Sequence, residues 1–115
     1  MTLSAEIQKI AMKALQLEIN GLEELKHSLD TNFENVIATL SKIKGKIILT
    51  GMGKSGHVAR KIAATLASTG SPSFFVHPAE ASHGDLGMIS TDDVVILLSN
   101  SGETLELKDI INYSK

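Results

Sequence analysis

Two short stretches of the chain carry side chains that could do chemistry. The first reads SNSGET, Ser99 to Thr104, and it follows the apolar run DVVILL. A helix that starts here would leave several N–H groups unpaired and carry roughly half a positive charge. With the hydroxyls of Ser99, Ser101 and Thr104, and with Gly102 allowing a close turn, this start could hold one phosphate group. By itself the stretch is equally typical of a Ser/Thr helix cap followed by an acidic first turn.

The second stretch reads GMGKSG, Gly51 to Gly56, and is expected to form a loop between a strand and its helix. It matches the dinucleotide-binding pattern G-x-G-x-x-G, which expects an acidic residue about 20 residues later to hold a ribose. Here the second strand ends in FFVHP, and the nearest carboxylate, that of Glu80, lies beyond the proline. Lys54 is also bulky for a pyrophosphate site, and Ile48 replaces the first glycine of a P-loop. The sequence therefore disfavours a nucleotide cofactor.

Three short apolar runs around these stretches predict strands. The third run is apolar without alternation, as in a strand covered on both faces. The runs are KIILTG at 46–51, PSFFVHP at 72–78 and DVVILLSN at 93–100. Each is expected to be followed by helical or irregular structure, which is the signature of a parallel α/β sheet in three layers, helices on strands on helices.

Helices are predicted between these strands and before them. HVARKIAATLASTG, residues 57–70, is expected to bury Val58, Ile62, Ala63 and Leu66 and to stop at Gly70. A further helix is expected to begin with ETLELK at residue 103.

The N-terminal part shows helical spacing of apolar residues from Leu3 to Leu40, broken near DTNFE. Thr31 and Glu34 have the spacing of a capping box, so a second helix is expected to start there and to end by Gly45. We therefore predict two helices without catalytic residues at 1–45, packed on a core or on another subunit, and the α/β domain at 46–115.

The order of the strands decides whether the two chemical stretches meet. If the first strand is central, with the second on one side and the third on the other, the sheet has the flavodoxin-like order 2-1-3. Ligands of open α/β sheets bind beyond the carboxyl ends of the strands where the chain reverses direction. We therefore expect GMGKSG and SNSGET to face one crevice.

Composition narrows the function classes. The 115 residues suit one domain, the net charge is −2 and aromatic residues make up 3%, so nucleic acid is not expected as a partner. No apolar run approaches the roughly 20 residues of a membrane span, and the start of the chain does not resemble a signal peptide. Four scattered histidines without cysteine predict no metal site. We expect a cytoplasmic protein.

From Lys46 to Lys115 the sequence closely resembles the sugar isomerase (SIS) domain of arabinose-5-phosphate isomerases. The resemblance is carried by GMGKSGH, HPAEASHGDLGM and SNSGET. It implies interconversion of ribulose 5-phosphate and arabinose 5-phosphate, which supplies the lipopolysaccharide sugar Kdo, without a cofactor and in a homo-oligomer, commonly a tetramer. Such domains have more strands than the three predicted here, so the chain is expected to hold a truncated, N-terminal part of one.

The resemblance also implies roles for particular residues. The serine-rich loop holds the phosphate through Ser99, Ser101 and Thr104, and Ser55 is a second ligand-contacting serine. Gly53 and Gly102 complete the expected substrate-binding set. The expected catalytic residues are Lys54, His83 and Glu103.

The chemistry of an aldose–ketose isomerase assigns a task to each expected catalytic residue. Glu103 is the expected base at carbon, Lys54 the stabiliser of the enediolate charge, and His83 the group that opens the ring or moves protons between oxygens. Asp85 is a candidate to orient His83, two residues before it. His57, His27 and His77 are expected to be structural, His57 as a capping or interface group. The alternative is a non-catalytic phosphosugar-binding module, or an inactive fragment, which would need only the serines.

Overall fold

The computed structural model describes residues 2–82, 84–102 and 105–115. The described chain divides into two compact units, Met1–Ala38 and Thr39–Lys115. The first holds the long helix α1 (Leu3–Ser28) and most of α2 (Thr31–Lys42), and neither helix has a buried residue among those described. The two predicted N-terminal helices are thus confirmed. The predicted cap is wrong: Asp30 is the capping residue, because its carboxylate accepts a hydrogen bond from the N–H of Phe33 at 3.1 Å.

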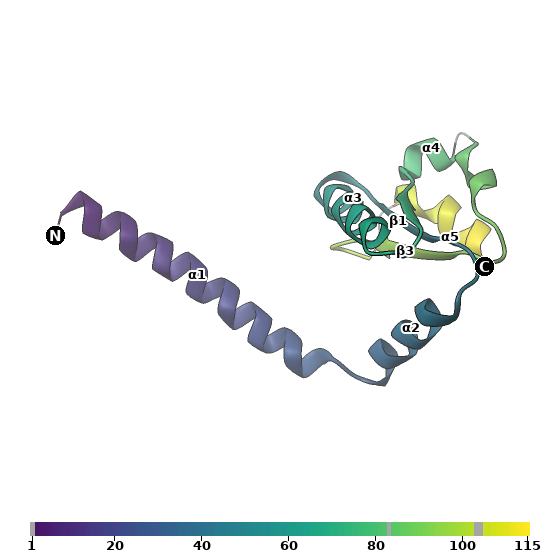
Figure 1. Ribbon diagram of the computed structural model, residues 1–115. Coiled ribbons are helices and arrows are strands. Elements are labelled where there is room, and N and C mark those ends of the chain that lie inside the picture. The colour runs from purple at the N-terminus through teal and green to yellow at the C-terminus, as the bar shows by residue number, and fades with distance from the viewer. Residues whose placement is uncertain (1, 83, 103–104) are drawn as a thin grey trace. The chain divides into compact units, whose positions relative to one another are not determined.

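The second unit is built on a parallel sheet of three strands (Figure 1). The strands are β1 (Ile47–Gly51), β2 (Ser73–Phe75) and β3 (Val94–Leu98). Their order is β2-β1-β3, as the sequence predicted. β1 pairs with β2 from Ile47↔Ser73 and with β3 from Ile47↔Val94 to Gly51↔Leu98. Among the described strands β1 is therefore central, which fits its complete burial.

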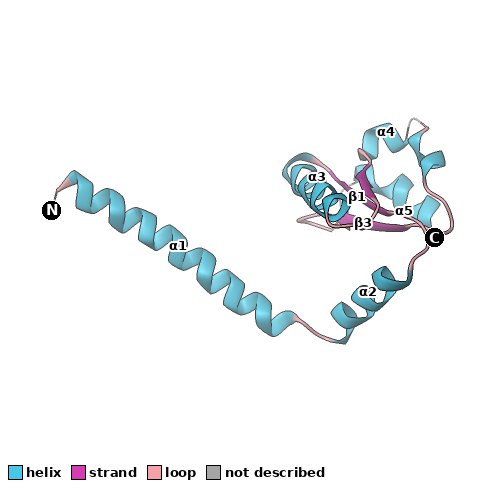
Figure 2. Ribbon diagram, in the orientation of Figure 1, coloured by secondary structure: helices cyan, strands magenta, loops and turns pink. Residues whose placement is uncertain are grey.

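Helices cover both faces of this sheet, as Figure 2 shows. α3 (Gly53–Ser68) packs on one face, over a cluster that includes Ile47 and Leu49 of β1 and Ala59 and Ala63 of α3. The other face is covered by short elements, which bury Ile48, Val76 and Ala81 together. These elements are α4 (Pro78–Ser82), the 3₁₀ turns Asp85–Met88 and Leu105–Leu107, and α5 (Lys108–Ser114).

β3 has apolar contacts on both faces, which explains its unbroken apolar run. Val95 and Leu97 pack against the cluster that contains Ile48, Val76 and Ala81. Ile96 and Leu98 pack against the cluster under α3 that contains Ala59 and Ala63. The prediction of a strand covered on both sides is therefore confirmed.

The buried face of α3 agrees with the prediction at Ala63 and differs from it at Val58. Val58 is 51% exposed, whereas Gly56, Ala59 and Ala63 are buried. Small residues form this stripe because the helix backbone lies close to the sheet. The predicted Val58 contact is wrong, but Ile62 and Leu66 do pack against the cluster at its margin.

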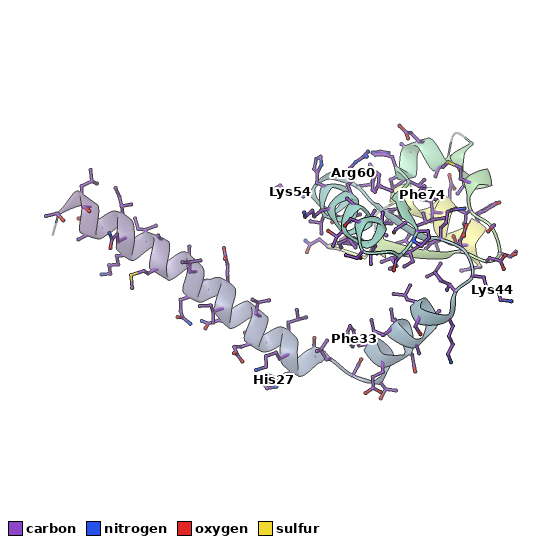
Figure 3. The ribbon with its side chains drawn as sticks, viewed as in Figure 1. His27, Phe33, Lys44, Lys54, Arg60 and Phe74 are labelled. Atoms are coloured by element: carbon purple, nitrogen blue, oxygen red, sulfur yellow. The ribbon has the colours of Figure 1, made fainter. Side chains whose placement is uncertain are left out.

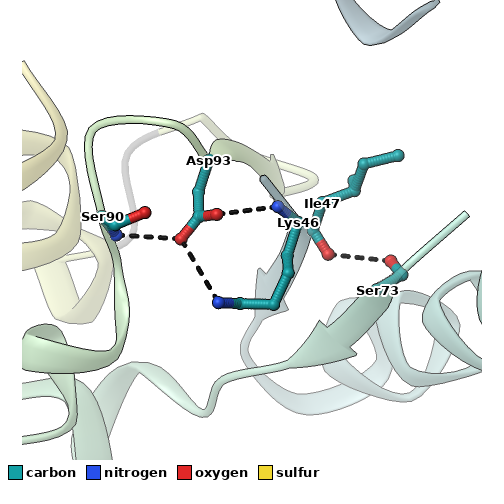
Figure 4. A network of polar contacts seen from close by, with 5 residues as sticks. All are labelled: Lys46, Ile47, Ser73, Ser90 and Asp93. Carbon is teal, nitrogen blue, oxygen red and sulfur yellow. Dashed lines mark hydrogen bonds and ion pairs between the residues drawn. The ribbon is translucent and has the colours of Figure 1, made fainter. Parts of the chain in front are cut away.

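A buried carboxylate fastens the amino-terminal edge of the sheet (Figure 4). Asp93 accepts hydrogen bonds from the N–H groups of Lys46 at 2.7 Å and Ser90 at 2.8 Å. Its side chain is fully buried, and the ammonium group of Lys46 lies 3.9 Å away. The N–H of Lys46, followed by that of Ser90, holds the pKa of Asp93 below its usual value. This network joins the segments that lead into β1 and β3.

Candidate functional site

The two chemical stretches leave the sheet at the same edge. Gly51 and Leu98 are register partners at the carboxyl ends of β1 and β3. Neighbouring strands lie about 4.8 Å apart, and a Cβ added at Gly51 would lie 3.0 Å from the carbonyl oxygen of Leu98. Lys54 and Ser101 each lie three residues beyond these partners. The topology therefore brings GMGKSG and SNSGET to adjacent positions, as the strand order required.

GMGKSG is mostly helical and not the loop that was predicted. Only Met52 separates the strand from α3, which begins at Gly53. Gly53 has a φ of +57°, a backbone conformation that glycine adopts without strain. Among the described residues, no side-chain hydrogen bond caps the start of α3. The first turn, which includes Lys54 and Ser55, therefore presents N–H groups without a side-chain cap at the carboxyl edge of the sheet.

The last glycine of this stretch has a packing role. Gly56 is buried, and a Cβ at this position would lie 2.6 Å from the carbonyl oxygen of Gly51. The G-x-G-x-x-G spacing is therefore explained by contact between helix and strand, without a dinucleotide.

Ser99–Gly102, the described part of SNSGET, form a tight bend after β3. The hydroxyl oxygen of Ser99 accepts a hydrogen bond from the N–H of Gly102 at 2.9 Å, and Gly102 has a φ of +72°. Ser99 is half-buried, whereas Ser101 and Gly102 are exposed. The bend thus turns the chain around a short polar segment at the same edge as Lys54.

The helix expected to start at SNSGET starts later. A 3₁₀ turn, Leu105–Leu107, comes first, and α5 begins only at Lys108. The dipole of that helix is therefore not at the serine loop, whereas α3 starts directly after the neighbouring strand β1. Glu103 and Thr104 lie outside the described residues, as does His83.

Two hydrogen bonds hold the segment between β2 and His83. Thr50 is fully buried, and its hydroxyl donates to the carbonyl of Val76 at 2.5 Å. The next residue, His77, accepts a hydrogen bond at Nδ1 from the N–H of Ala79 at 3.1 Å, inside the first turn of α4. The prediction that His77 is structural is thus supported by a capping contact. The side chain of Asp85, expected to orient His83, is not described.

Sequence reasoning missed a small pocket of about 170 Å³ on the β2 side of α3. It is lined by Gly51, Gly53, Gly56, His57, Arg60, Phe75 and His77. His57 lies in the second turn of α3, so it does not open the helix as was expected. Its spacing from Arg60 puts both on one side of the helix, a signal that the sequence did contain.

The described part of the chain has neither a candidate metal site nor a membrane-spanning helix. Its His, Asp and Glu side chains form no group of three that could hold a metal ion. None of its helices is long and apolar enough to cross a membrane.

Comparison with known proteins decides the family. The model of the SIS domain matches residues 39–115, which is most of the chain. The chain belongs to the SIS domain family. The match begins a few residues before the boundary predicted at 45/46, which stays a prediction.

Individual SIS proteins are similar over most of this chain. Arabinose 5-phosphate isomerase KdsD of Francisella tularensis is 52% identical over 108 residues, which are 91% of this chain and 33% of that protein. KdsD of Escherichia coli K12 is 50% identical over 110 residues, which are 96% of this chain and 34% of that protein. The chain thus spans about a third of the length of these curated relatives.

A solved structure shares the fold over the whole chain. The E. coli CFT073 protein c3406, in complex with A5P, superposes with a TM-score of 0.86 and 47% identity, over 100% of this chain and 63% of that one. The α/β fold with its 2-1-3 sheet is therefore that of an SIS protein.

Proposed function

We propose that this chain is the N-terminal part of an enzyme that interconverts ribulose 5-phosphate and arabinose 5-phosphate. The relatives named arabinose 5-phosphate isomerase and the A5P-bound neighbour support this reaction. The structural observation that supports it most is the pairing of Gly51 with Leu98. Because of this pairing, GMGKSG and SNSGET leave the sheet at neighbouring positions of the same edge. Further parts of the proposal are a cytoplasmic homo-oligomer, such as a tetramer, and a role in supplying Kdo for lipopolysaccharide.

The serine-rich bend is proposed to bind the phosphate. Ser99 and Ser101 supply hydroxyls, Gly102 keeps the bend tight, and Thr104 adds a third hydroxyl. The uncapped N–H groups at Gly53–Ser55 lie at the same edge and favour an anion through the positive end of α3. Lys54 is exposed in this first turn, and its ammonium is proposed to contact the ligand that the bend holds.

The reaction moves one proton between C1 and C2 of the sugar. In the proposed mechanism Glu103 removes the proton from one carbon, and the electron pair of that C–H bond forms an enediolate. Lys54 stabilises the negative charge on the enediolate oxygen, and the protonated Glu103, which exchanges with solvent, then delivers a proton to the other carbon. His83 opens the sugar ring and moves a proton between the two oxygens. One carbon is oxidised as its neighbour is reduced, so there is no net redox change and the proposed reaction needs no external oxidant or reductant.

A second candidate function is a phosphosugar-binding module without catalysis. It is favoured by the fact that the start of α3 and the serine bend, as described, are sufficient to hold an anion without any catalytic group. Both functions require the serine bend, and only the enzyme requires Lys54, His83 and Glu103.

Incubation with ribulose 5-phosphate in deuterated water separates the two functions. The enzyme incorporates deuterium at carbon and forms arabinose 5-phosphate, both visible by NMR. Lys54→Ala should lower this rate by about a hundredfold or more, while Lys61→Ala, an exposed lysine on the same helix, should leave it unchanged. Ligand-induced shifts without deuterium uptake would favour the binding module, and full activity of Lys54→Ala would remove the proposed charge-stabilising role.

A further inference from the structure

The pocket on the β2 side of α3 is separate in its lining from the serine bend. It shares Gly51, Gly53 and Gly56 with GMGKSG, and its other residues come from α3 and from the segment that runs from β2 to His77. None of its residues comes from β3 or from the described residues Ser99–Gly102. Its volume of about 170 Å³ is below the roughly 300–1,000 Å³ of pockets for drug-sized ligands. The pocket therefore suits one small chemical group.

The exposed side chain of Arg60, which stacks on Phe75, forms one side of this pocket. The guanidinium carbon of Arg60 lies 4.1 Å from the centre of the Phe75 ring, within stacking distance. Figure 3 shows Arg60 on α3, the helix that also carries Lys54. No carboxylate forms an ion pair with Arg60 among the side chains that the structure describes. Stacking holds the charged fork in place without neutralising it, so its N–H donors are ready for an anion.

Two imidazole rings complete the polar lining. The Nδ1 atom of His77 accepts the N–H of Ala79, so the neutral ring carries its proton on Nε2 and can donate there. The ring of Phe75 contacts His77 edge-on, with centroids 6.3 Å apart, and fixes the ring further. His57 lines the pocket from the same helix as Arg60. Every described ionisable side chain of this lining is a cation or a potential cation.

We propose that this pocket is a second anion site, which binds one phosphate group independently of the phosphosugar at the serine bend. The group can belong to inorganic phosphate or to a phosphate monoester, since both present the same oxygens. Arg60 makes the planar two-point contact, His77 donates from Nε2, and His57 adds a third donor. At Gly53 an added Cβ would meet no atom within 4 Å, so there is open space for the oxygens beside the start of the helix.

Phosphate titration of the isotope-labelled full chain tests the site. Ionic strength is held constant with sodium chloride, and NMR follows the Arg60 side-chain N–H and the Phe75 and His77 amides, with Ser101 and Gly102 as reporters of the serine bend. Arg60→Gln should weaken phosphate binding at Phe75 and His77 by about tenfold, the loss expected for one charge-assisted pair. Lys61→Gln removes the same charge from a neighbouring exposed position and should change it less than about twofold.

The same titrations distinguish the two anion sites. Ser101→Ala should weaken the response at the serine bend and leave the pocket's phosphate affinity unchanged. Titration with arabinose 5-phosphate shows whether a monoester also reaches the pocket. The proposal is overturned if phosphate does not shift the pocket signals, or if Arg60→Gln and Lys61→Gln weaken binding equally. It is also overturned if Ser101→Ala abolishes both responses, because the pocket would then be part of one sugar site.

Discussion

Replacing Gly56 with alanine tests how the fold positions the first chemical stretch. The added Cβ would lie 2.6 Å from the carbonyl oxygen of Gly51 and 3.2 Å from its carbon. To reach an ordinary contact of about 3.4 Å, helix and strand must separate by about 0.8 Å. Both contacts are to backbone atoms, which cannot rotate away as a side chain would.

The expected magnitude follows from two opposing terms. Overpacking of this kind costs about 1–3 kcal/mol, and the rigid backbone places Gly56→Ala near the upper end. Alanine gains about 1 kcal/mol over glycine in a helix. We therefore expect a net loss of about 2 kcal/mol in the free energy of unfolding of the sheet-bearing unit.

Urea unfolding followed by the amide NMR signals of β1 and α3 measures this loss. Gly21→Ala is the control, since Gly21 lies in α1 with no atom within 4 Å of the added Cβ. That substitution should leave the unfolding of β1 and α3 unchanged. If Gly56→Ala proved as stable as the natural chain, the close packing of α3 on β1 would be refuted.

Three other substitutions test single contacts. Asp93→Asn should cost about 1–3 kcal/mol at neutral pH, and exposed Asp92→Asn should cost much less. Because folding lowers the pKa of Asp93, its stabilisation is present above the usual value of 3.8 and disappears as the pH falls through the lowered pKa, so the difference should vanish in acid unfolding curves. His77→Ala should expose the Ala79 amide to hydrogen exchange and cost about 1 kcal/mol, while His77→Asn keeps an acceptor; equal protection in both would refute the cap. Thr50→Val should cost about 1–2 kcal/mol in urea unfolding, Thr50→Ser much less, and equal losses would contradict the hydrogen bond.

Much of the sheet could be predicted because its signals are local. Short β-branched runs predict buried strands, and their spacing requires helical crossovers. The order β2-β1-β3 then follows from placing the first strand in the centre. This order alone brings GMGKSG and SNSGET to one edge.

The errors arise where tertiary packing overrides local preference. Val58 has the right spacing for a buried face, but the close approach at Gly56 allows only small residues along the contact. Ser99 and the residues after it resemble a helix cap. In the structure the hydroxyl oxygen of Ser99 instead accepts a hydrogen bond from the N–H of Gly102 within the bend, and α5 starts only at Lys108.

The pocket around Arg60 was missed for a different reason. Its lining joins a helix to the end of the neighbouring strand, and only the folded register brings His57 and Arg60 beside Phe75 and His77. The sequence contained the spacing of His57 and Arg60, but no local pattern links them to β2.

The central claim is that the first turn of α3 and the serine bend hold one phosphosugar together. Amide NMR shifts during titration with arabinose 5-phosphate test it most directly. We predict that the signals of Lys54 and Ser55 and those of Ser101 and Gly102 move with a single dissociation constant, and that Ser101→Ala weakens both sets equally. Movement of only one set, or two unrelated dissociation constants, would contradict the account.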